Sequence, residues 1–341
     1  MEKRQRRSRN RVTLNDVARR ARVSPMTVSR TFNAPDQVSP DLREIVMRAV
    51  EDLGYIQNRL AGALASNRSG VVAIVIPSLV NNVFLAMTNA IHKVLVARGV
   101  QPLITVTDYS FENERSAISN ILAWSPDGLV LVGVDHSPAL RKLIENSGIP
   151  VVETVQVGSG AIDMNVGIDH FEAGRAMGTH LVERGYKSVW MLGVELEADR
   201  RASQRFEGCC SVLEAAGLRT DLVRQLPFED NLTFGQQTFA MVAKAGYEKS
   251  AIFYGNDLMA IGALQGAKDA GLSVPGDVGI AGFNGIDMAA FVDPKLTTIR
   301  VPYVEMGRIT AEMLLADIEG VEPPTERFVK LQPVLIEGES T

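Results

Sequence analysis

The stretch that most constrains this chain lies at residues 13–33, TLNDVARRARVSPMTVSRTFN. Small apolar residues recur there with the period of a helix, at positions 14, 17, 18 and 21. Ser24 and Pro25 then supply a helix N-cap and a proline at the first helical position, which begin a second helix that ends near Phe32. Two short helices joined by a tight turn predict a helix-turn-helix, whose second helix would enter the major groove of DNA.

A third helix is predicted from Pro40, because apolar residues again recur at helical spacing, at positions 42, 45, 46, 49, 50 and 53. The three helices could share a small interior that includes Val28 and Phe32. The same pattern also fits a plain three-helix bundle whose arginines are only solvated, so periodicity alone does not decide between the two.

Charge favours DNA binding over a plain bundle. Residues 1–70 hold 14 Lys and Arg against 7 Asp and Glu, a net charge of +7, whereas the whole chain has a net charge of −5. A positive segment on an acidic protein suits phosphate neutralisation, because the release of counterions supplies most of the non-specific affinity for duplex DNA. Residues 1–12, without apolar periodicity, are predicted to be a basic disordered arm, and residues 13–57 the helix-turn-helix domain.

Residues 58–69 are interpreted as a hinge helix and linker. Asn58 can cap about two helical turns there. So short a helix is marginal by itself in water, and it is expected to form only on DNA.

From residue 70 to residue 341 short apolar runs alternate with longer amphipathic stretches. Runs such as VVAIVIP and GLVLVGV are typical of buried parallel strands with helices between them. Two rounds of this pattern predict an α/β body of two lobes, each with a doubly wound parallel sheet. Lobe 1 is placed at about residues 70–168 with part of 301–341, and lobe 2 at about residues 169–300.

Polar residues beyond the strand ends mark a candidate ligand cleft, because ligands of open α/β sheets bind there. Asp169 and Asp257 could accept hydrogen bonds from pairs of hydroxyls, and Arg205 could bind a carboxylate or two vicinal oxygens with its planar guanidinium. Plainer alternatives exist for all three. The two aspartates precede helices and could simply cap them, while Arg205 could form an ion pair.

Neither catalysis nor a membrane location is expected. The four histidines show no spacing typical of a nucleophile's partner or of zinc ligands, and no Gly-rich phosphate loop follows a strand, so we expect no enzyme, cofactor or metal. No apolar run approaches the roughly 20 residues of a membrane span. No apolar signal segment follows the arginine-rich start, and the chain is therefore expected in the cytoplasm, associated with the nucleoid.

The motifs TLNDVARRARVSPMTVSRTFN, VSPDLREIVMRAVEDLGY and NRLAGAL resemble the lactose-repressor family of bacterial transcription regulators, and the resemblance extends over essentially the whole chain. It implies a body with the fold of sugar-binding periplasmic proteins, three crossings between the lobes, and a last strand that returns to lobe 1. It assigns base contacts to Pro25, Met26 and Arg30. Phosphate contacts are implied for Thr13, Ser24, Thr27, Ser29 and Asn33.

In the hinge the resemblance implies DNA contacts by Asn58, Arg59, Ala61 and Leu64, with Leu64 wedged between base pairs in the minor groove. The family usually has proline where Gln57 stands, and Gly62 weakens the helix by about 1 kcal/mol relative to alanine. This hinge is therefore expected to be harder to order than those of its relatives.

For the cleft the resemblance places the effector on Asp169, Arg205 and Asp257, and adds residues of loops that line the same cleft, namely Ser78, Asn82, Phe84, Glu153 and Asn284. Its loops look most similar to those of gluconate-operon repressors and their ketogluconate-responsive relatives, which implies a sugar acid. The implied protein is a homodimeric repressor on a palindromic operator, whose effector weakens DNA binding. Alternatives are a neutral sugar, a corepressor-type effector, a sugar-binding protein that does not bind DNA, or an enzyme with Asp169 or Asp257 as its base.

Overall fold

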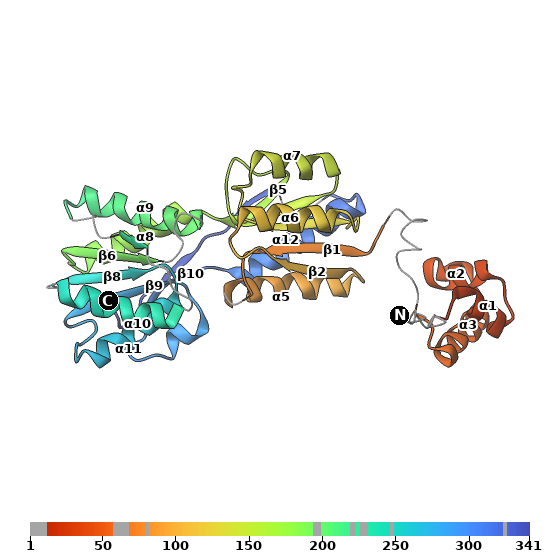
Figure 1. Ribbon diagram of the computed structural model, residues 1–341, viewed down its shortest axis with the longest axis horizontal. Coiled ribbons are helices and arrows are strands. Elements are labelled where there is room, and N and C mark those ends of the chain that lie inside the picture. The colour runs from red at the N-terminus through yellow and green to blue at the C-terminus, as the bar shows by residue number, and fades with distance from the viewer. Residues whose placement is uncertain are drawn as a thin grey trace, which may run out of the picture. The chain divides into compact units, whose positions relative to one another are not determined.

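The computed structural model describes residues 12–56, 68–79, 82–193, 199–218, 223–225, 231–245, 249–322 and 326–341. The chain divides into two compact units, Met1–Gly70 and Val71–Thr341, called here the head and the body (Figure 1). The arm predicted at residues 1–12 lies outside the described residues except for Val12. The four predicted DNA contacts of the hinge, Asn58, Arg59, Ala61 and Leu64, also lie outside them.

The head is a bundle of three helices, α1 (Leu14–Ala21), α2 (Pro25–Asn33) and α3 (Pro40–Leu53). Thr13 and Ser24 cap the first two, each accepting a hydrogen bond from a backbone N–H three residues on. The interior is formed by Val17, Ala18, Ala21, Val28, Val46 and Ala49. The prediction that Ile45 belongs to this interior is wrong. Ile45 is 47% exposed, because the residues that α3 buries are Val46 and Ala49.

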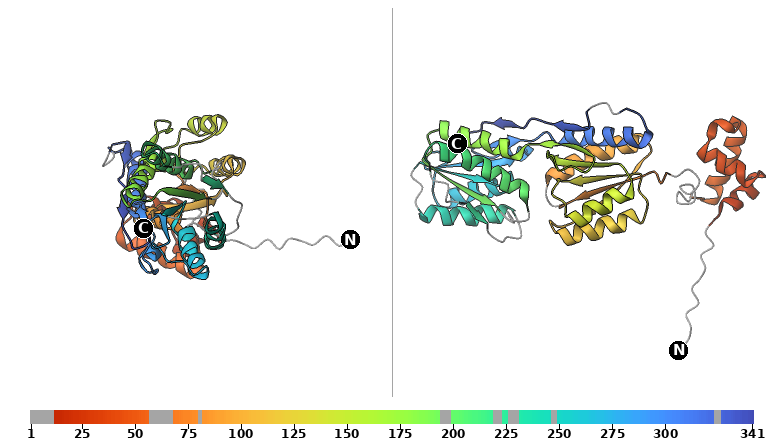
Figure 2. Two further views of the ribbon diagram at one scale, coloured as in Figure 1. Left: turned by 90° about the vertical axis from the view of Figure 1, so that its left-hand side faces the viewer. Right: turned by 90° about the horizontal axis from the view of Figure 1, so that it is seen from above.

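Lobe 1 of the body is built on six parallel strands in the order β11-β5-β4-β3-β1-β2. The strands are β1 (Val71–Ile76), β2 (Gln101–Val106), β3 (Gly128–Val132), β4 (Val151–Gln156), β5 (Met164–Ile168) and β11 (Phe328–Lys330). Helices cover both faces of the sheet (Figure 2), and they are α5 (Asn82–Ala97), α6 (Phe111–Leu122), α7 (Pro138–Ser147) and α12 (Tyr303–Glu319). The parallel sheet agrees with the predicted α/β architecture.

Lobe 2 has the strand order β12-β10-β9-β8-β6-β7. Its strands are β6 (Ser188–Gly193), β7 (Val223–Gln225), β8 (Ser250–Tyr254), β9 (Val278–Asn284), β10 (Thr297–Arg300) and β12 (Val334–Ile336). Its helices are α8 (His170–Glu183), α9 (Arg200–Ala215), α10 (Asn231–Ala245) and α11 (Asp257–Asp269). All the pairings are parallel except that of β12 with β10.

The prediction that the last strand returns to lobe 1 is wrong. The chain does return there with α12 and β11, but it then crosses back, and β12 joins the sheet of lobe 2. The residues after β12 hold it there, because Ser340 donates a hydrogen bond to the Ile280 carbonyl and accepts one from the Thr297 N–H. The last strand therefore completes lobe 2.

Among the described residues, no helix combines the length and the apolar character that a membrane crossing needs.

Candidate functional site

The first candidate site is the exposed face of α2 in the head. Met26 is 61% exposed, and Pro25 and Arg30 are also exposed, because Val28 and Thr31 are the residues that this helix buries. Ser24 and Asn33 are exposed as well, while Thr27 and Ser29 are half-buried. The residues predicted to contact bases therefore lie on the open side of the helix.

The arginines of the head differ in their ion pairs. Arg19 and Arg20 pair with Asp16 and Asp52. Arg30 forms no ion pair with any residue that the structure describes, so its guanidinium is available for a base edge or a phosphate. Thr13 is already engaged in the head, since its hydroxyl donates to the Asp16 carboxylate at 2.7 Å.

The second candidate site is a pocket of about 220 Å³ at the carboxyl ends of the lobe 1 strands. Such strand ends are the usual ligand position of doubly wound sheets. The first turn of α9, from lobe 2, supplies the arginines of its lining. Its charged and hydrogen-bonding side chains include Tyr109, Glu114, Asp135, His136, Gln156, Arg200 and Arg201.

Arg201 and Arg205 lie one turn apart on α9, and both are buried. Nε of Arg201 donates to the Asp199 carboxylate at 3.0 Å. Nη2 of Arg205 donates to the Gly255 carbonyl at 3.1 Å, and its guanidinium lies 4.2 Å from the centre of the Phe283 ring. Among the described residues, Arg205 forms no ion pair and its Nε has no hydrogen-bond partner.

His170 adds no charge to this group. Burial, reinforced by the positive charge of Arg205, holds the pKa of His170 well below its ordinary value, so the imidazole is neutral at neutral pH. Its Nδ1 lies 3.1 Å from Nη1 of Arg205 and accepts a hydrogen bond from it. Asp199 pairs with Arg201 and lies near Arg205 without an ion pair to it. Burial raises the pKa of Asp199, but the charges of Arg201 and Arg205 outweigh this effect and lower the pKa below its ordinary value. The buried group of Arg201, Arg205 and Asp199 carries excess positive charge.

Two glycines set the position of α9 against α8. A Cβ added at Gly174 would lie 1.9 Å from the Arg205 carbonyl oxygen, and one added at Gly208 would lie 2.0 Å from the Phe171 carbonyl oxygen. Only residues without side chains allow such close approach of two helix backbones. The position of both buried arginines therefore depends on this contact.

The predicted effector residues of lobe 1 lie on different elements and differ in how deeply they are buried. Phe84 is buried, and the guanidinium of Arg201 lies 5.9 Å from its ring centre. Ser78 is half-buried in the loop after β1. Asn82 begins α5, and its side chain lies outside the described residues.

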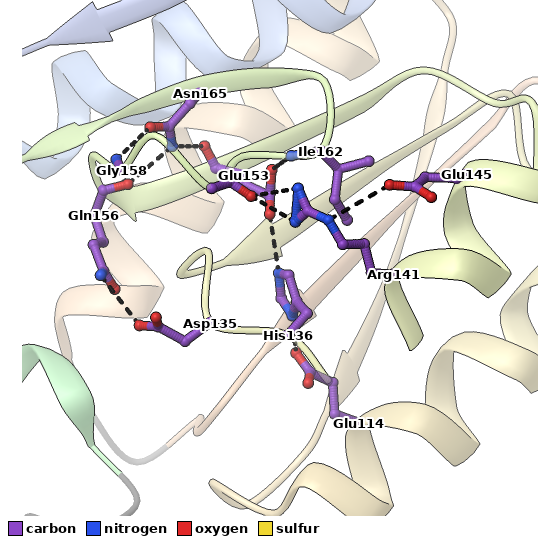
Figure 3. Close-up of polar contacts among 11 residues, drawn as sticks. Glu114, Asp135, His136, Arg141, Glu145, Glu153, Gln156, Gly158, Ile162 and Asn165 are labelled. Carbon is purple, nitrogen blue, oxygen red and sulfur yellow. Dashed lines mark hydrogen bonds and ion pairs between the residues drawn. The ribbon is translucent and has the colours of Figure 1, made fainter. Parts of the chain in front are cut away.

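Glu153 lies within strand β4 (Figure 3) and not on a loop, which corrects the prediction. Its side chain is fully buried. It accepts a hydrogen bond from the Ile162 N–H, and its Oε1 lies 3.3 Å from Nε2 of His136. Nδ1 of His136 lies 3.0 Å from the Glu114 carboxylate. Burial alone would lower the pKa of His136, but hydrogen bonds and charges of Glu114 and Glu153 raise it to about 9, so His136 is an imidazolium at neutral pH.

In lobe 2 the side chains of three predicted effector residues, Asp169, Asn284 and Asp257, already form contacts within the protein. Asp169 caps α8 and forms an ion pair with Lys330 at 2.8 Å, and it lines a separate crevice together with residues of α8, β10 and the segment 330–333. Asn284 accepts a hydrogen bond from the Tyr303 hydroxyl at 2.8 Å. The cap of α11 is Asn256. Asp257, the next residue, is fully buried and accepts hydrogen bonds from the Thr298 hydroxyl at 2.5 Å and the Ile286 N–H at 2.8 Å.

Three residues that line the pocket, Asp135, Gln156 and Arg201, are not assigned to the ligand site by the sequence analysis. A usable signal existed for Arg201, because it precedes Arg205 by four residues and so shares its helix face. The others had none, since a single polar residue at the end of a strand does not reveal its partner. No group of three or more His, Cys, Asp or Glu in the described part of the chain is placed to hold a metal ion.

Asp257 leads to a prediction about pH and stability. Burial raises the pKa of Asp257 to about 7, although hydrogen bonds from Thr298 and Ile286 lower it. A raised pKa in the folded state stabilises the fold at low pH, and this contribution is lost as the pH rises from about 3.8 through about 7. In Asp257→Asn the amide can accept from Ile286 and donate to Thr298 without titrating, so we expect the variant to gain about 1 to 3 kcal/mol over wild type between pH 5 and pH 8. Urea unfolding at pH 5 and pH 8 measures the free energy of unfolding, with the exposed Asp287→Asn as the control. If the free energies of unfolding of wild type and Asp257→Asn changed equally with pH, the prediction would be contradicted.

Comparisons with known proteins cover both units. Residues 13–58 match the family described as "Bacterial regulatory proteins, lacI family", and residues 179–341 match a periplasmic binding protein-like domain. The HTH-type transcriptional regulator GntR of Pseudomonas aeruginosa is 38% identical, over 93% of this chain and 92% of that one. A LacI-family transcriptional regulator from Silicibacter pomeroyi has a similar structure, with a TM-score of 0.90 and 35% identity over 96% of this chain and 99% of that one. A lac repressor dimer bound to operator and the anti-inducer ONPF gives a TM-score of 0.81 at 25% identity, over 97% and 99% of the two chains.

Proposed function

Because this chain belongs to the lacI family of bacterial regulatory proteins and is a DNA-binding transcription regulator, we propose that it is a repressor controlled by a sugar acid. The sugar acid is of the gluconate or ketogluconate class, and its binding in the body lowers the affinity of the head for operator DNA. The protein acts in the cytoplasm, where it meets both operator and metabolite. The chain is a regulator and not an enzyme.

The observation that supports an anionic ligand is the excess of buried positive charge beside the pocket. Arg201 and Arg205 are both buried, and Asp199 pairs with Arg201 alone. A buried charge without a full set of partners is costly, and an anion that enters the pocket beside Arg201 would reduce this cost. A carboxylate matches the planar guanidinium geometrically, whereas a neutral sugar would leave the charge uncompensated.

The pocket also suggests how a ligand could act at a distance. Lobe 1 supplies most of its lining and lobe 2 supplies the arginines of α9, so a ligand held by both would favour the closed arrangement of the lobes. In a homodimer this closure would change how the first lobes meet, and the hinges at residues 58–69 would lose the register in which they pair on a palindromic operator. In this proposal residues 13–57 read the DNA and residues 70–341 form the sensor.

The proposal is tested by calorimetric titration of gluconate, 2-ketogluconate and other sugar acids, with and without a duplex that the protein itself selects from a randomised pool. We expect a sugar acid to bind more weakly to the DNA complex than to free protein, because effector and operator must lower each other's affinity by the same factor. Tighter binding in the presence of DNA would indicate a corepressor. Equal affinities in both states, or the absence of binding by any sugar acid, would refute the proposed regulation.

The exposed face of α2 gives a separate prediction about DNA binding. Arg30→Ala should weaken binding to the selected operator by about 1 to 3 kcal/mol and relax selectivity at one base step, because an exposed arginine on a recognition helix typically binds guanine with two hydrogen bonds. Affinity for unrelated duplexes should fall far less. Fluorescence anisotropy with operators carrying single base changes measures both effects, with Arg48→Ala on α3 as the control, since Arg48 pairs with Glu44. Unchanged selectivity at every position would exclude Arg30 as a base reader.

A further inference from the structure

Two residues that lobe 1 contributes to the pocket, Asp135 and Gln156, offer hydrogen-bond acceptors, and they are called here the acceptor wall. Gln156, at the end of β4, is only 4% exposed, and its Nε2 donates to Oδ2 of Asp135 at 3.1 Å (Figure 3). A carboxylate only accepts hydrogen bonds, so this contact fixes which way the amide points. Oε1 of Gln156 receives no hydrogen bond from any residue that the structure describes. Gln156 lines the pocket, so this carbonyl oxygen can accept a hydrogen bond from a bound hydroxyl.

Gln156 and Arg201 are brought close together at Gly133. This glycine has a φ of +85°, and a Cβ placed on it would lie 3.7 Å from Oε1 of Gln156 and 3.7 Å from Nη1 of Arg201. The empty space over Gly133 therefore has an acceptor from lobe 1 and a donor from lobe 2 beside it. A side chain at this position would occupy that space and would be strained by the positive φ.

The acceptor wall is held in place by the charged cluster of Glu114, His136 and Glu153. His136 directly follows Asp135, and its side chain is only 2% exposed between the two glutamates. These contacts join the loop after β3 to α6 and to β4 (Figure 3). His136 is therefore a positioning residue that fixes the Asp135 loop, and Asp135 itself is exposed.

We propose that Asp135 and Gln156 accept hydrogen bonds from the hydroxyls of the effector while Arg201 binds its carboxylate, so that the pocket accepts a sugar acid in one orientation. This inference rests on the proposed function and adds the residues that recognise the polyol part. A carboxylate can donate no hydrogen bond and is repelled by Asp135, so it is directed toward Arg201. Hydroxyls donate to the acceptors on the opposite wall.

The test is a titration of wild type and Asp135→Ala with gluconate and with its analogues that each lack one hydroxyl. We expect Asp135→Ala to bind gluconate roughly 10-fold more weakly or worse, the effect of losing a hydrogen bond to a charged group. For the analogue that lacks the hydroxyl bound by Asp135, wild type and variant should bind with equal affinity. Glu112→Ala serves as the control, because it removes the same charge from an exposed position on α6 that does not line the pocket.

The direction in which Asp135→Ala changes the affinity for gluconate distinguishes a hydrogen bond from a purely electrostatic effect of Asp135. If Asp135 acted only as a negative charge near an anion, its removal would tighten gluconate binding, and this result would overturn the inference. The same loss for every analogue would also overturn it, since it would indicate distortion of the loop. If wild type binds neither gluconate nor any other sugar acid, the proposed function fails; if wild type binds and Asp135→Ala binds equally well, only the present inference fails.

Discussion

Gly174→Ala is expected to lower the free energy of unfolding of the body by about 3 kcal/mol or more, near the upper end of what overpacking costs. The added Cβ would lie 1.9 Å from the Arg205 carbonyl oxygen, which belongs to the backbone of α9 and cannot rotate away. The sign is informative, because alanine in place of glycine inside a helix otherwise stabilises it by about 1 kcal/mol. Chemical unfolding followed by circular dichroism measures the change.

The same substitution should weaken effector binding at temperatures where the variant remains folded. Separation of α8 and α9 moves Arg201 away from the pocket, so effector affinity and stability fall together. Gly160→Ala is the matched control, because an added Cβ there meets no atom within 4 Å. A Gly174→Ala protein as stable as the control would show that the two helices can separate at little cost.

Arg201→Gln is expected to weaken binding of the sugar acid by at least roughly 30-fold, since loss of one member of a buried charge pair typically costs about 2 kcal/mol or more. The variant should still bind operator and should no longer release it when the sugar acid is added. Removing this guanidinium leaves Arg205 and Asp199 to balance each other, so the excess positive charge disappears. Calorimetry gives the affinity, and fluorescence anisotropy of labelled operator gives the response.

Arg200→Gln is the control for this prediction, because it removes the same charge from the neighbouring residue. The Arg200 side chain is 57% exposed and paired with Glu207, and such surface pairs contribute little. We expect its effect on affinity to be below threefold. Equal losses in the two variants would mean that general attraction of the anion, and not the buried guanidinium, determines binding.

Much of the fold followed from hydrophobic periodicity. The strands β1 and β3 are apolar runs that are almost entirely buried, and the sequence analysis predicts both. Strand β5 was missed because Asn165 and Gly167 interrupt its apolar pattern. The Asn165 side chain donates to the Glu153 and Gln156 carbonyls, which is why a polar residue is tolerated there.

The site was harder to predict than the fold, because its residues meet through tertiary contacts. Asp169 has the residue type of a ligand acceptor, but Lys330, far away in the sequence, occupies its carboxylate. Glu153 was placed among the cleft residues, whereas its partner is His136. Conversely, nothing local distinguishes Gln156 from any other strand residue, and its importance appears only when Asp135 and Gly133 lie beside it.

The way the chain crosses between the lobes has a consequence for synthesis on the ribosome. Lobe 1 needs α12 and β11, and lobe 2 needs β12, and all three come from the final forty residues of the sequence. Neither sheet can therefore acquire its last strand while the nascent chain still lacks this segment. The head has all its core residues within residues 14–55 and can fold as soon as it leaves the exit tunnel, so a DNA-reading module exists well before its sensor.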